Sequence, residues 1–277
     1  MERLEALRSL QDNFATMAND PQLKETCYMC SAPAVSREHV PPRCLFPESK
    51  DLGGLNLRKE LITVPSCAAH NGAKSCDDEF LMMSLAGIVG NNSIGYRHWA
   101  GKVDRALRRS SYRVLNSTVL KPKRIERLVL EGNHFIDVIW GTPDIARLYR
   151  CFEHVLRGLF FHDFGHRFEG EVRLIPGFIK YEPGQTQTWQ KLIEARYRYD
   201  ADSMPRTGGN PEVFYYQQFP VDEHGLIAYR LCFYGGVDVY ACLIPATVRM
   251  PGNLVAEMIS GGVKTVITVG ERAFTFN

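Results

Sequence analysis

The apolar residues near the start of the chain recur at helical spacing, and charged residues separate them. They are Leu4, Leu7, Leu10, Phe14 and Met17. This period predicts one amphipathic helix over residues 3–18, ended by Asn19-Asp20-Pro21. We expect the helix to dock on its own domain, with a partner helix as the alternative. Because charge interrupts the apolar residues, the segment is not a signal peptide.

Residues 27–85 contain few periodic segments and many turn formers. Helical character with basic residues on several faces returns over 97–115, and Lys121-Pro122-Lys123 resembles a joint to a second domain. Beyond the joint, a helix is predicted from Pro143 to Phe161. Alternation and apolar runs predict strands over Phe135–Trp140, Glu171–Ile175, Leu226–Tyr234 and Val237–Leu243.

Gly235-Gly236 lies between the last two predicted strands, and both glycines can take a positive φ, which favours a two-residue hairpin turn. We therefore expect an α+β protein with four segments. They are an N-terminal helix (1–22), a small module (23–86), a basic helical connector (87–123) and a larger mixed α/β C-terminal domain (124–277).

Composition places the chain among soluble proteins. Hydrophobic residues make up 45% and charged residues 23%, and no apolar run is long enough to span a bilayer. We expect a cytoplasmic protein with no membrane partner. The C-terminal domain is the candidate surface for a protein partner or a second copy of the chain.

The net charge of +2 does not by itself require a polyanionic partner, but the charges are unevenly distributed. Only Asp104 and Glu126 are acidic between positions 97 and 127, where ten residues are basic. The basic residues are Arg97, Lys102, Arg105, Arg108, Arg109, Arg113, Lys121, Lys123, Arg124 and Arg127. This stretch is a candidate phosphate-binding face, with a solvated helix as the alternative.

Four metal-ligand side chains stand in two short pairs, Cys27-x2-Cys30 and Cys67-x2-His70. Two such knuckles predict one tetrahedral structural zinc site, against the alternative of cysteines buried by chance. The remaining five cysteines have no partner pattern and are expected to be reduced, mostly packing residues. They are Cys44, Cys76, Cys151, Cys232 and Cys242.

Between the knuckles lies Arg37-Glu38-His39-Val40-Pro41-Pro42, and Asn71-x2-Lys74-Ser75-x2-Asp78 follows the second knuckle. Over about residues 25–85, a fifth of the chain, this pattern resembles the HNH endonucleases, or ββα-metal nucleases. The resemblance implies a zinc-stabilised ββα module with His39 as general base and Glu38 and Asn71 as ligands of a catalytic Mg²⁺ or Mn²⁺. It also implies that Cys27, Cys30, Cys67 and His70 hold the structural zinc.

The sequence departs from the commonest pattern at two positions. His70 stands where a fourth cysteine is usual, but imidazole also binds zinc. Asn71 stands where many members have histidine, and its amide oxygen suits Mg²⁺. If residues 68–84 form one helix, Asn71, Ser75 and Asp78 share a face, so Asp78 is a candidate additional ligand.

Elementary chemistry supports the same roles, because phosphodiester hydrolysis needs a base, a cation and positive groups that hold the backbone. Glu38 and His39 are adjacent, so the backbone must be irregular there if both serve one site. The candidate nucleic-acid contacts are Arg37, Arg43, Lys74, Arg105, Arg108 and Arg109. The expected partner is DNA, with RNA as an alternative.

Two weaker patterns favour structural roles. His162, Asp163 and His166 contain enough ligands for a second metal, but packing and capping are the favoured interpretation. Phe214-Tyr215-Tyr216 could stack bases, but its spacing favours cross-strand packing.

The sequence thus predicts a metal-dependent HNH endonuclease that hydrolyses DNA, similar to bacterial restriction or phage-defence effectors. The alternative is a non-catalytic zinc-knuckle protein that binds nucleic acid or acts as a scaffold. A third possibility is that the C-terminal domain is itself the enzyme and the zinc module only docks it.

Overall fold

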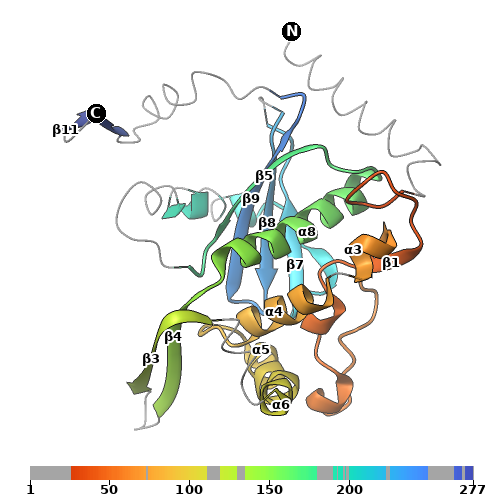
Figure 1. Cartoon of the computed structure of the whole chain (residues 1–277), viewed down its shortest axis with the longest axis vertical. Helices are drawn as coiled ribbons and strands as arrows, with labels where there is room; N and C mark the ends of the chain where they lie inside the picture. The colour runs from red at the N-terminus through yellow and green to blue at the C-terminus, as the bar shows by residue number, and fades with distance from the viewer. Residues whose placement is uncertain are drawn as a thin grey trace.

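The computed structural model describes residues 26–72, 74–110, 119–129, 135–179, 190–191, 193–195, 197, 200–222, 225–248, 265–269 and 272–276. The helix predicted over 3–18 lies outside these ranges. Helices and antiparallel sheets alternate along the described chain, which confirms the α+β class (Figure 1). Among these residues, no helix has the length and apolar character needed to cross a membrane.

The largest sheet has five antiparallel strands in the order β5-β9-β8-β7-β6. Four of the strands pair with a neighbour in continuous register, whereas the pairing of β6 with β7 shifts once. The strands are β5 (Gly170–Pro176), β6 (Thr207–Asn210), β7 (Phe214–Gln218), β8 (Ile227–Phe233) and β9 (Val237–Pro245). The strands predicted for β5, β8 and β9 are confirmed.

The turn between β8 and β9 differs from the expected two-residue turn. Tyr234 and Gly235 have positive φ values of 48° and 68°, whereas Gly236 does not. Gly236 is required for another reason, because an added Cβ would lie 2.1 Å from the carbonyl oxygen of Gly90. The turn therefore meets a segment from the N-terminal half of the chain, which local sequence cannot indicate.

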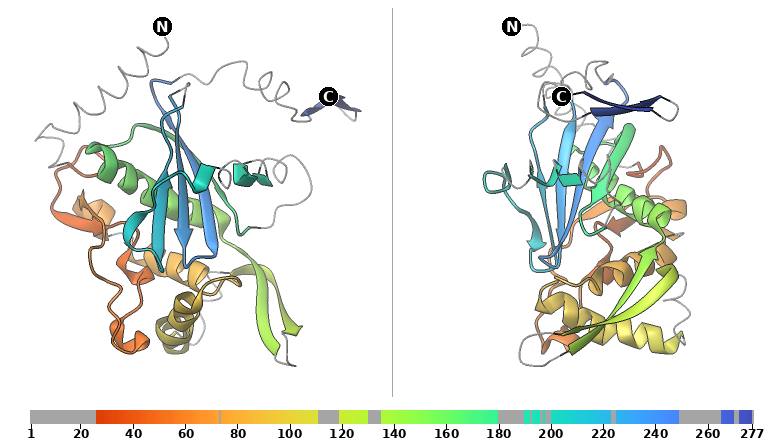
Figure 2. Two further views of the ribbon diagram at one scale, coloured as in Figure 1. Left: turned by 180° about the vertical axis from the view of Figure 1, so that it is seen from behind. Right: turned by 90° about the vertical axis from the view of Figure 1, so that its left-hand side faces the viewer.

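A long helix, α8 (Ile145–Phe164), lies across one face of this sheet (Figures 1 and 2). Asp144 caps its start by accepting a hydrogen bond from the backbone N–H of Arg147 at 3.0 Å, and Gly165 ends it at φ 74°. The prediction that Pro143 begins the helix is wrong. Pro143 ends strand β4 (Phe135–Pro143), because Asp144 is the residue that can satisfy the first free N–H groups.

The small module consists of an antiparallel pair followed by helices. Strand β1 (Ser36–His39) pairs with β2 (Thr63–Ser66), and α3 (Ala68–Gly72) and α4 (Ser75–Ala86) follow directly. The single helix expected over 68–84 is therefore divided in two. Lys74 is the N-cap residue of the second helix, and its carbonyl oxygen accepts from the backbone N–H groups of Asp77 and Asp78.

Two 3-10 turns, η1 (Arg43–Leu45) and η2 (Ser49–Leu52), occupy the long connection between β1 and β2. The helical connector contains α5 (Ser93–His98), the π-helical segment η3 (Trp99–Val103) and α6 (Asp104–Arg109). The expected joint at 121–123 is not a linker but lies inside strand β3 (Val119–Val129), where the pairing with β4 shifts. A further pair, β10 (Thr265–Val269) and β11 (Arg272–Phe276), lies near the C-terminus.

Helix α8 joins the small module to the sheet. Phe152 of α8 packs on Phe233 of β8, with ring centroids 6.0 Å apart. On the module side, the Arg147 Nε atom lies 2.6 Å from the Asp77 Oδ1 atom. At Gly158 an added Cβ would lie 2.6 Å from the Val40 Cγ2 atom. One continuous cluster of buried side chains runs from Cys27 to Leu243, so the two parts share a core.

The contact between Gly158 and Val40 generates a prediction for stability. Gly158→Ala should lower the free energy of unfolding by about 1–3 kcal/mol, because the new methyl group overlaps Val40. The double variant Gly158→Ala/Val40→Ala should recover part of this loss. Denaturant unfolding measures the free energy of unfolding of the single and the double variant. Gly72→Ala is the control, because a Cβ there meets nothing within 4 Å. If Gly158→Ala and Gly72→Ala lower the free energy of unfolding equally, the proposed steric conflict is wrong.

Candidate metal centre and neighbouring polar site

The first pair of metal-ligand residues lies in a tight turn before β1. An isolated bridge between Thr26 and Pro33 closes this turn, and the Cys27 backbone N–H donates to the Ala32 carbonyl at 2.9 Å. The Met29 N–H points at the Cys27 sulfur, 3.4 Å away. These contacts hold the Cys27 and Cys30 side chains on one side of the turn.

The second pair lies where β2 ends and α3 begins. Cys67 immediately precedes α3, and His70 lies within its only full turn. The backbone N–H of His70, followed by contacts with the His70 ring and the other two thiols, lowers the pKa of Cys67 to about 6. Cys67 is therefore largely thiolate at neutral pH, which is the form that binds a metal.

The four ligand atoms come together within 4.8 Å of one another. The His70 Nδ1 atom lies 3.5 Å from the Cys27 sulfur, 3.5 Å from that of Cys30 and 3.2 Å from that of Cys67. The sulfurs of Cys30 and Cys67 are 3.8 Å apart. Tetrahedral coordination with ordinary zinc bond lengths requires about 3.8 Å between two sulfurs and about 3.5 Å between sulfur and nitrogen. The geometry therefore fits one zinc ion, and we call these four residues the zinc tetrad.

Helix α8 covers one side of the zinc tetrad. The His154 ring lies edge-on to the His70 ring, with centroids 6.5 Å apart. Burial, with smaller effects of Lys74 and His70, lowers the pKa of His154 to about 4, so His154 is neutral at pH 7. A neutral ring can pack beside the tetrad without adding a charge.

The other five cysteines form no disulfide, as expected. Cys44 and Cys151 donate to the carbonyl oxygens of Asp78 and Asp77, at 3.2 Å and 3.6 Å. Cys76 is exposed. Among the described residues, the zinc tetrad is the only group of three or more His, Cys, Asp or Glu side chains close enough to hold a metal.

Glu38 lies inside the module rather than on its surface. Glu38 as a whole is only 6% exposed, and its Oε1 atom lies 3.9 Å from the ammonium group of Lys74, a residue that is 5% exposed. Lys74 also donates to the hydroxyl oxygen of the buried Tyr28 at 3.3 Å. Burial raises the pKa of Glu38, Lys74 opposes this and Asp78 adds to it.

Asp78 lies within electrostatic range of the same pair, and burial likewise raises its pKa. Glu38, Lys74 and Tyr28 thus form one buried polar cluster near the zinc tetrad, with the half-buried Asp78 within electrostatic range. Sequence reasoning missed Tyr28, because an aromatic residue inside a knuckle has no spacing that distinguishes it from core packing. It also treated Lys74 as a surface contact for phosphate, whereas its ammonium faces Glu38 and Tyr28.

His39 lies at the opposite side of the strand from Glu38. Strand β1 keeps regular pairing through its last two residues, with Glu38 opposite Val64 and His39 opposite Thr63. The irregular backbone that one site for both Glu38 and His39 would require is therefore absent from β1, and adjacent side chains face opposite ways. His39 is half-buried, and burial together with the nearby Arg43 lowers its pKa. Its imidazole is therefore neutral at pH 7.

Asn71 reaches the same face of β1 as Glu38. Its Nδ2 atom donates to the Ser36 hydroxyl at 2.7 Å, and Ser36 and Glu38 are two residues apart on the strand. The amide nitrogen makes this bond, so the amide oxygen is the atom that a cation would use. However, Glu38 faces Lys74 and Asn71 faces Ser36, so these side chains do not form a ready-made cage for a catalytic cation.

The candidate nucleic-acid contacts differ in their surroundings. Arg37 donates to the Thr63 side chain and carbonyl, each at 2.9 Å, and Arg43 is exposed on η1. Arg105 and Arg108 are paired with carboxylates, and Arg109 is exposed.

The two weaker sequence patterns have structural roles, as predicted. Asp163 accepts hydrogen bonds from the hydroxyl groups of Tyr216 and Tyr229 at 2.5 Å and 3.0 Å, rather than joining a metal cluster. The aromatic run at 214–216 is buried in β7, and the Phe214 ring lies 4.9 Å from that of Phe233.

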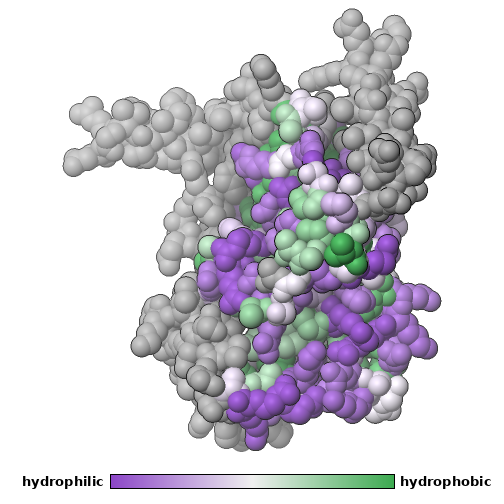
Figure 3. Space-filling view, turned by 45° about the vertical axis from the view of Figure 1, so that its right-hand side comes forward, coloured by the Kyte–Doolittle hydropathy of each residue, from purple (hydrophilic) through white to green (hydrophobic). Residues whose placement is uncertain are grey.

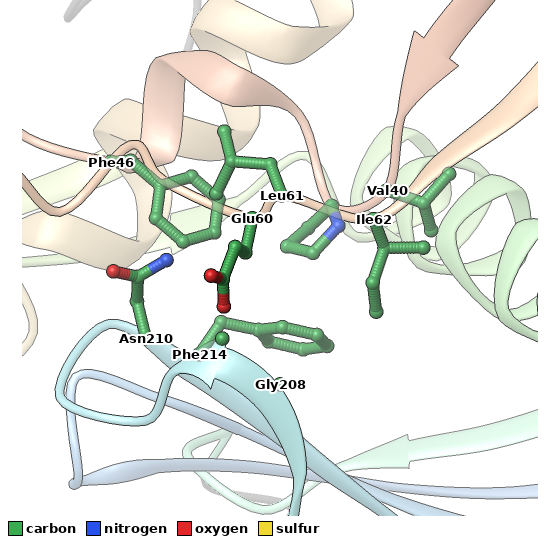
Figure 4. Close-up of a pocket in the computed structure, with 10 residues that line it drawn as sticks. Val40, Phe46, Glu60, Leu61, Ile62, Gly208, Asn210 and Phe214 are labelled. Carbon is green, nitrogen blue, oxygen red and sulfur yellow. The ribbon is translucent and has the colours of Figure 1, made fainter.

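A small, partly open hollow lies between the small module and β6–β7 (Figure 4). Val40, directly after His39, forms part of its wall, and the Glu60 side chain points toward Phe214. Asn210 closes one side by donating to the Lys59 carbonyl at 2.8 Å. The hollow marks the boundary at which the module and the sheet meet.

No family model matches the chain, and no curated protein or solved structure matches it either. Functional inference therefore depends on the chemistry of the residues themselves.

The geometry of the zinc tetrad predicts about one zinc ion per purified chain. Cys27→Ser or Cys67→Ser should remove the zinc and make the chain protease-sensitive or insoluble, because the ligands hold the knuckle to α3. Elemental analysis and limited proteolysis provide the measurements. Cys76→Ser is the matched control, since that thiol is exposed and outside the tetrad. Folded wild-type protein without zinc would rule out the site.

Proposed function

We propose that this protein is a metal-dependent nuclease of the HNH kind, acting on the phosphodiester bonds of DNA. The observation that carries the proposal is the setting of His39. A half-buried, neutral imidazole lies at the end of the first strand of a ββα arrangement that a zinc tetrad holds together, and the cationic Arg43 lies beside it.

Each part of this setting matches a requirement of the reaction. A neutral imidazole can accept a proton from the attacking water, which is the task of a general base. Arg43 can attract the phosphate whose phosphorus that water attacks. The order strand, strand, helix with zinc ligands before the first strand and at the first helix is the arrangement implied by the resemblance to HNH nucleases.

The proposed cation would bind through Glu38 and Asn71, with Asp78 as an additional candidate. Mg²⁺ or Mn²⁺ would supply positive charge to the scissile phosphate and the leaving oxygen. Lys74 already compensates the charge of Glu38, so a cation can bind Glu38 only if this ion pair opens. Asn71 and Glu38 approach one face of β1, which supports this pairing, whereas His39 faces the other side of the strand. For all three to serve one site, the ion pair with Lys74 must open and the end of β1 must change conformation.

A second function is favoured by one specific observation. Because Glu38 is buried on Lys74, it can serve as a structural ion pair, and the protein would then bind nucleic acid without cutting it. In this case Glu38 would contribute to folding only. Cleavage of foreign DNA, as in restriction or phage defence, belongs to the first function alone.

His39→Ala should reduce cleavage of plasmid DNA at least about 10²-fold, because no other group would take the proton. Zinc content, unfolding midpoint and DNA affinity should stay near wild type. His162→Ala is the matched control, since it replaces an exposed histidine outside the module. Cleavage by His39→Ala at the wild-type rate would exclude His39 as the base.

Glu38 and Asn71 provide the test that separates the two functions. Asn71→Ala and Glu38→Gln should weaken cleavage in a way that more Mg²⁺ or Mn²⁺ partly restores, whereas His39→Ala should not respond. Glu38→Gln also leaves Lys74 unpaired and should destabilise the fold, and Glu38→Gln/Lys74→Met should recover stability. If the double variant recovers full cleavage as well, Glu38 is a structural residue and does not bind the cation.

A further inference from the structure

Strand β5 forms one edge of the five-stranded sheet. It pairs with β9 on one side, and among the described residues no strand pairs with its other side. Glu171 and Arg173 are exposed on one face of β5, whereas Val172 and Leu174 are partly buried and pack against the core. A strand with one open side presents unpaired N–H and C=O groups that can pair with another strand.

The hydrogen bonds at the two ends of β5 show which backbone groups face the open side. The Ala246 N–H donates to the Glu169 carbonyl and the Gly177 N–H donates to the Asp238 carbonyl, each at 2.8 Å. Both pairs continue the unbroken register of β5 with β9, so the odd-numbered residues of β5 exchange hydrogen bonds with β9. The N–H and C=O groups of the even-numbered residues therefore point away from β9.

The open edge is short and has defined ends. At its start, the Gly170 carbonyl already accepts a hydrogen bond from the Arg157 Nη2 atom at 3.0 Å. At its end, Pro176 has no N–H to donate. Between these ends, the outward N–H groups of Val172 and Leu174 have no acceptor among the described residues. A further strand can therefore pair along residues 170–174.

The charges on β5 are complementary to those of a second copy of the same strand. Within one chain, the Arg173 Nε atom lies 2.7 Å from the Glu171 Oε1 atom. If two copies pair antiparallel about a two-fold axis at Val172, Glu171 of each copy lies opposite the partner's Arg173. The four side chains then form a square of alternating charge, and each charge gains a second neighbour of opposite sign.

Neighbouring registers lack this agreement. An axis between two residues places outward-facing groups opposite inward-facing ones, so it forms no backbone hydrogen bonds. An axis at Arg173 places two arginines directly opposite each other, and an axis at Glu171 does the same with two glutamates, which is destabilising. Hydrogen bonding and charge therefore favour the same axis, at Val172.

Apolar contact surfaces are less defined than this edge. The exposed large apolar residues of the described chain are scattered, since Val35 precedes β1, Leu55 follows η2, and Val89 and Tyr96 lie near α5. The lower part of the molecule, where α5 and α6 lie in Figure 1, is largely hydrophilic in the view of Figure 3. The edge of β5 is therefore the stronger candidate for a contact with a partner.

We propose that two copies of this chain associate through β5, across a two-fold axis at Val172. The two five-stranded sheets then form one continuous sheet, and the Val172 N–H of each copy donates to the partner's Val172 carbonyl. A contact along one strand edge is smaller than the interface of a stable dimer, so the association is weak and depends on concentration. It does not depend on the proposed nuclease activity.

The test exchanges charges on β5 and measures dimerisation of the full chain by sedimentation equilibrium. Wild type should dimerise at low salt and protein concentrations up to about 0.3 mM. Glu171→Arg and Arg173→Glu each place like charges opposite each other, twice per dimer by symmetry, and should weaken the dimer at least about tenfold. Arg109→Glu is the control, because it makes the same change of charge as Arg173→Glu at an exposed position of α6. It should leave the dimer within about twofold of wild type.

Mixing the two single variants separates a lost interface from a damaged fold. Glu171→Arg makes both positions positive and Arg173→Glu makes both negative, so the two variants are complementary to each other. Their equimolar mixture should form a heterodimer with an affinity no more than about threefold below that of the wild-type dimer. The double variant Glu171→Arg/Arg173→Glu restores opposite charges and should dimerise like wild type.

Three results would overturn the proposal. The first is a wild-type chain that stays monomeric under these conditions. The second is a dimer that neither single variant weakens, because its contact would then lie on another surface. The third is a pair of single variants that stay monomeric when mixed. Since none of these measurements involves cleavage, they leave the proposed nuclease function to its own tests.

Discussion

Four ligands from two distant turns can lie around one zinc-sized point only if the turn before β1 and the start of α3 hold fixed positions. This constraint sets the register of β1 against β2, and with it the side of the strand on which Glu38 and His39 lie. Buried side chains of the module and of α8 belong to one core, and α8 meets the module where Gly158 packs against Val40. The metal centre and the shared core therefore support each other.

Strand β1 separates two polar environments that are adjacent in sequence. On one face, Glu38 lies in a buried cluster with Lys74 and Tyr28, where each charge needs a partner because water is excluded. On the other face, His39 is half-buried, neutral and close to Arg43. The first environment suits a structural role or a cation held after rearrangement, and the second suits proton transfer. The nuclease proposal requires both environments to act in one reaction, whereas the binding proposal requires chemistry from neither.

The number of basic residues in a stretch of this protein does not tell how much positive charge is free, because carboxylates pair with some of them. The connector is the most basic stretch of the sequence, yet Arg105 and Arg108 lie against carboxylates that the fold supplies. Among the described residues, Arg43 has no carboxylate within ion-pair distance, whereas Arg58 lies 3.8 Å from Glu48. The net charge of +2 therefore does not show which basic residues already have carboxylate partners.

The sequence by itself determined what depends on neighbours along the chain. The knuckle spacing indicated the zinc tetrad, alternation indicated β8 and β9, and helical periodicity indicated α8, because these patterns repeat over a few residues. Only the tertiary structure decided the burial of Lys74 against Glu38 and the pairing of Arg105 with Asp51. Those partners lie tens of residues apart, and burial and charge depend on which distant segments the packing of α8 and the zinc tetrad bring into contact.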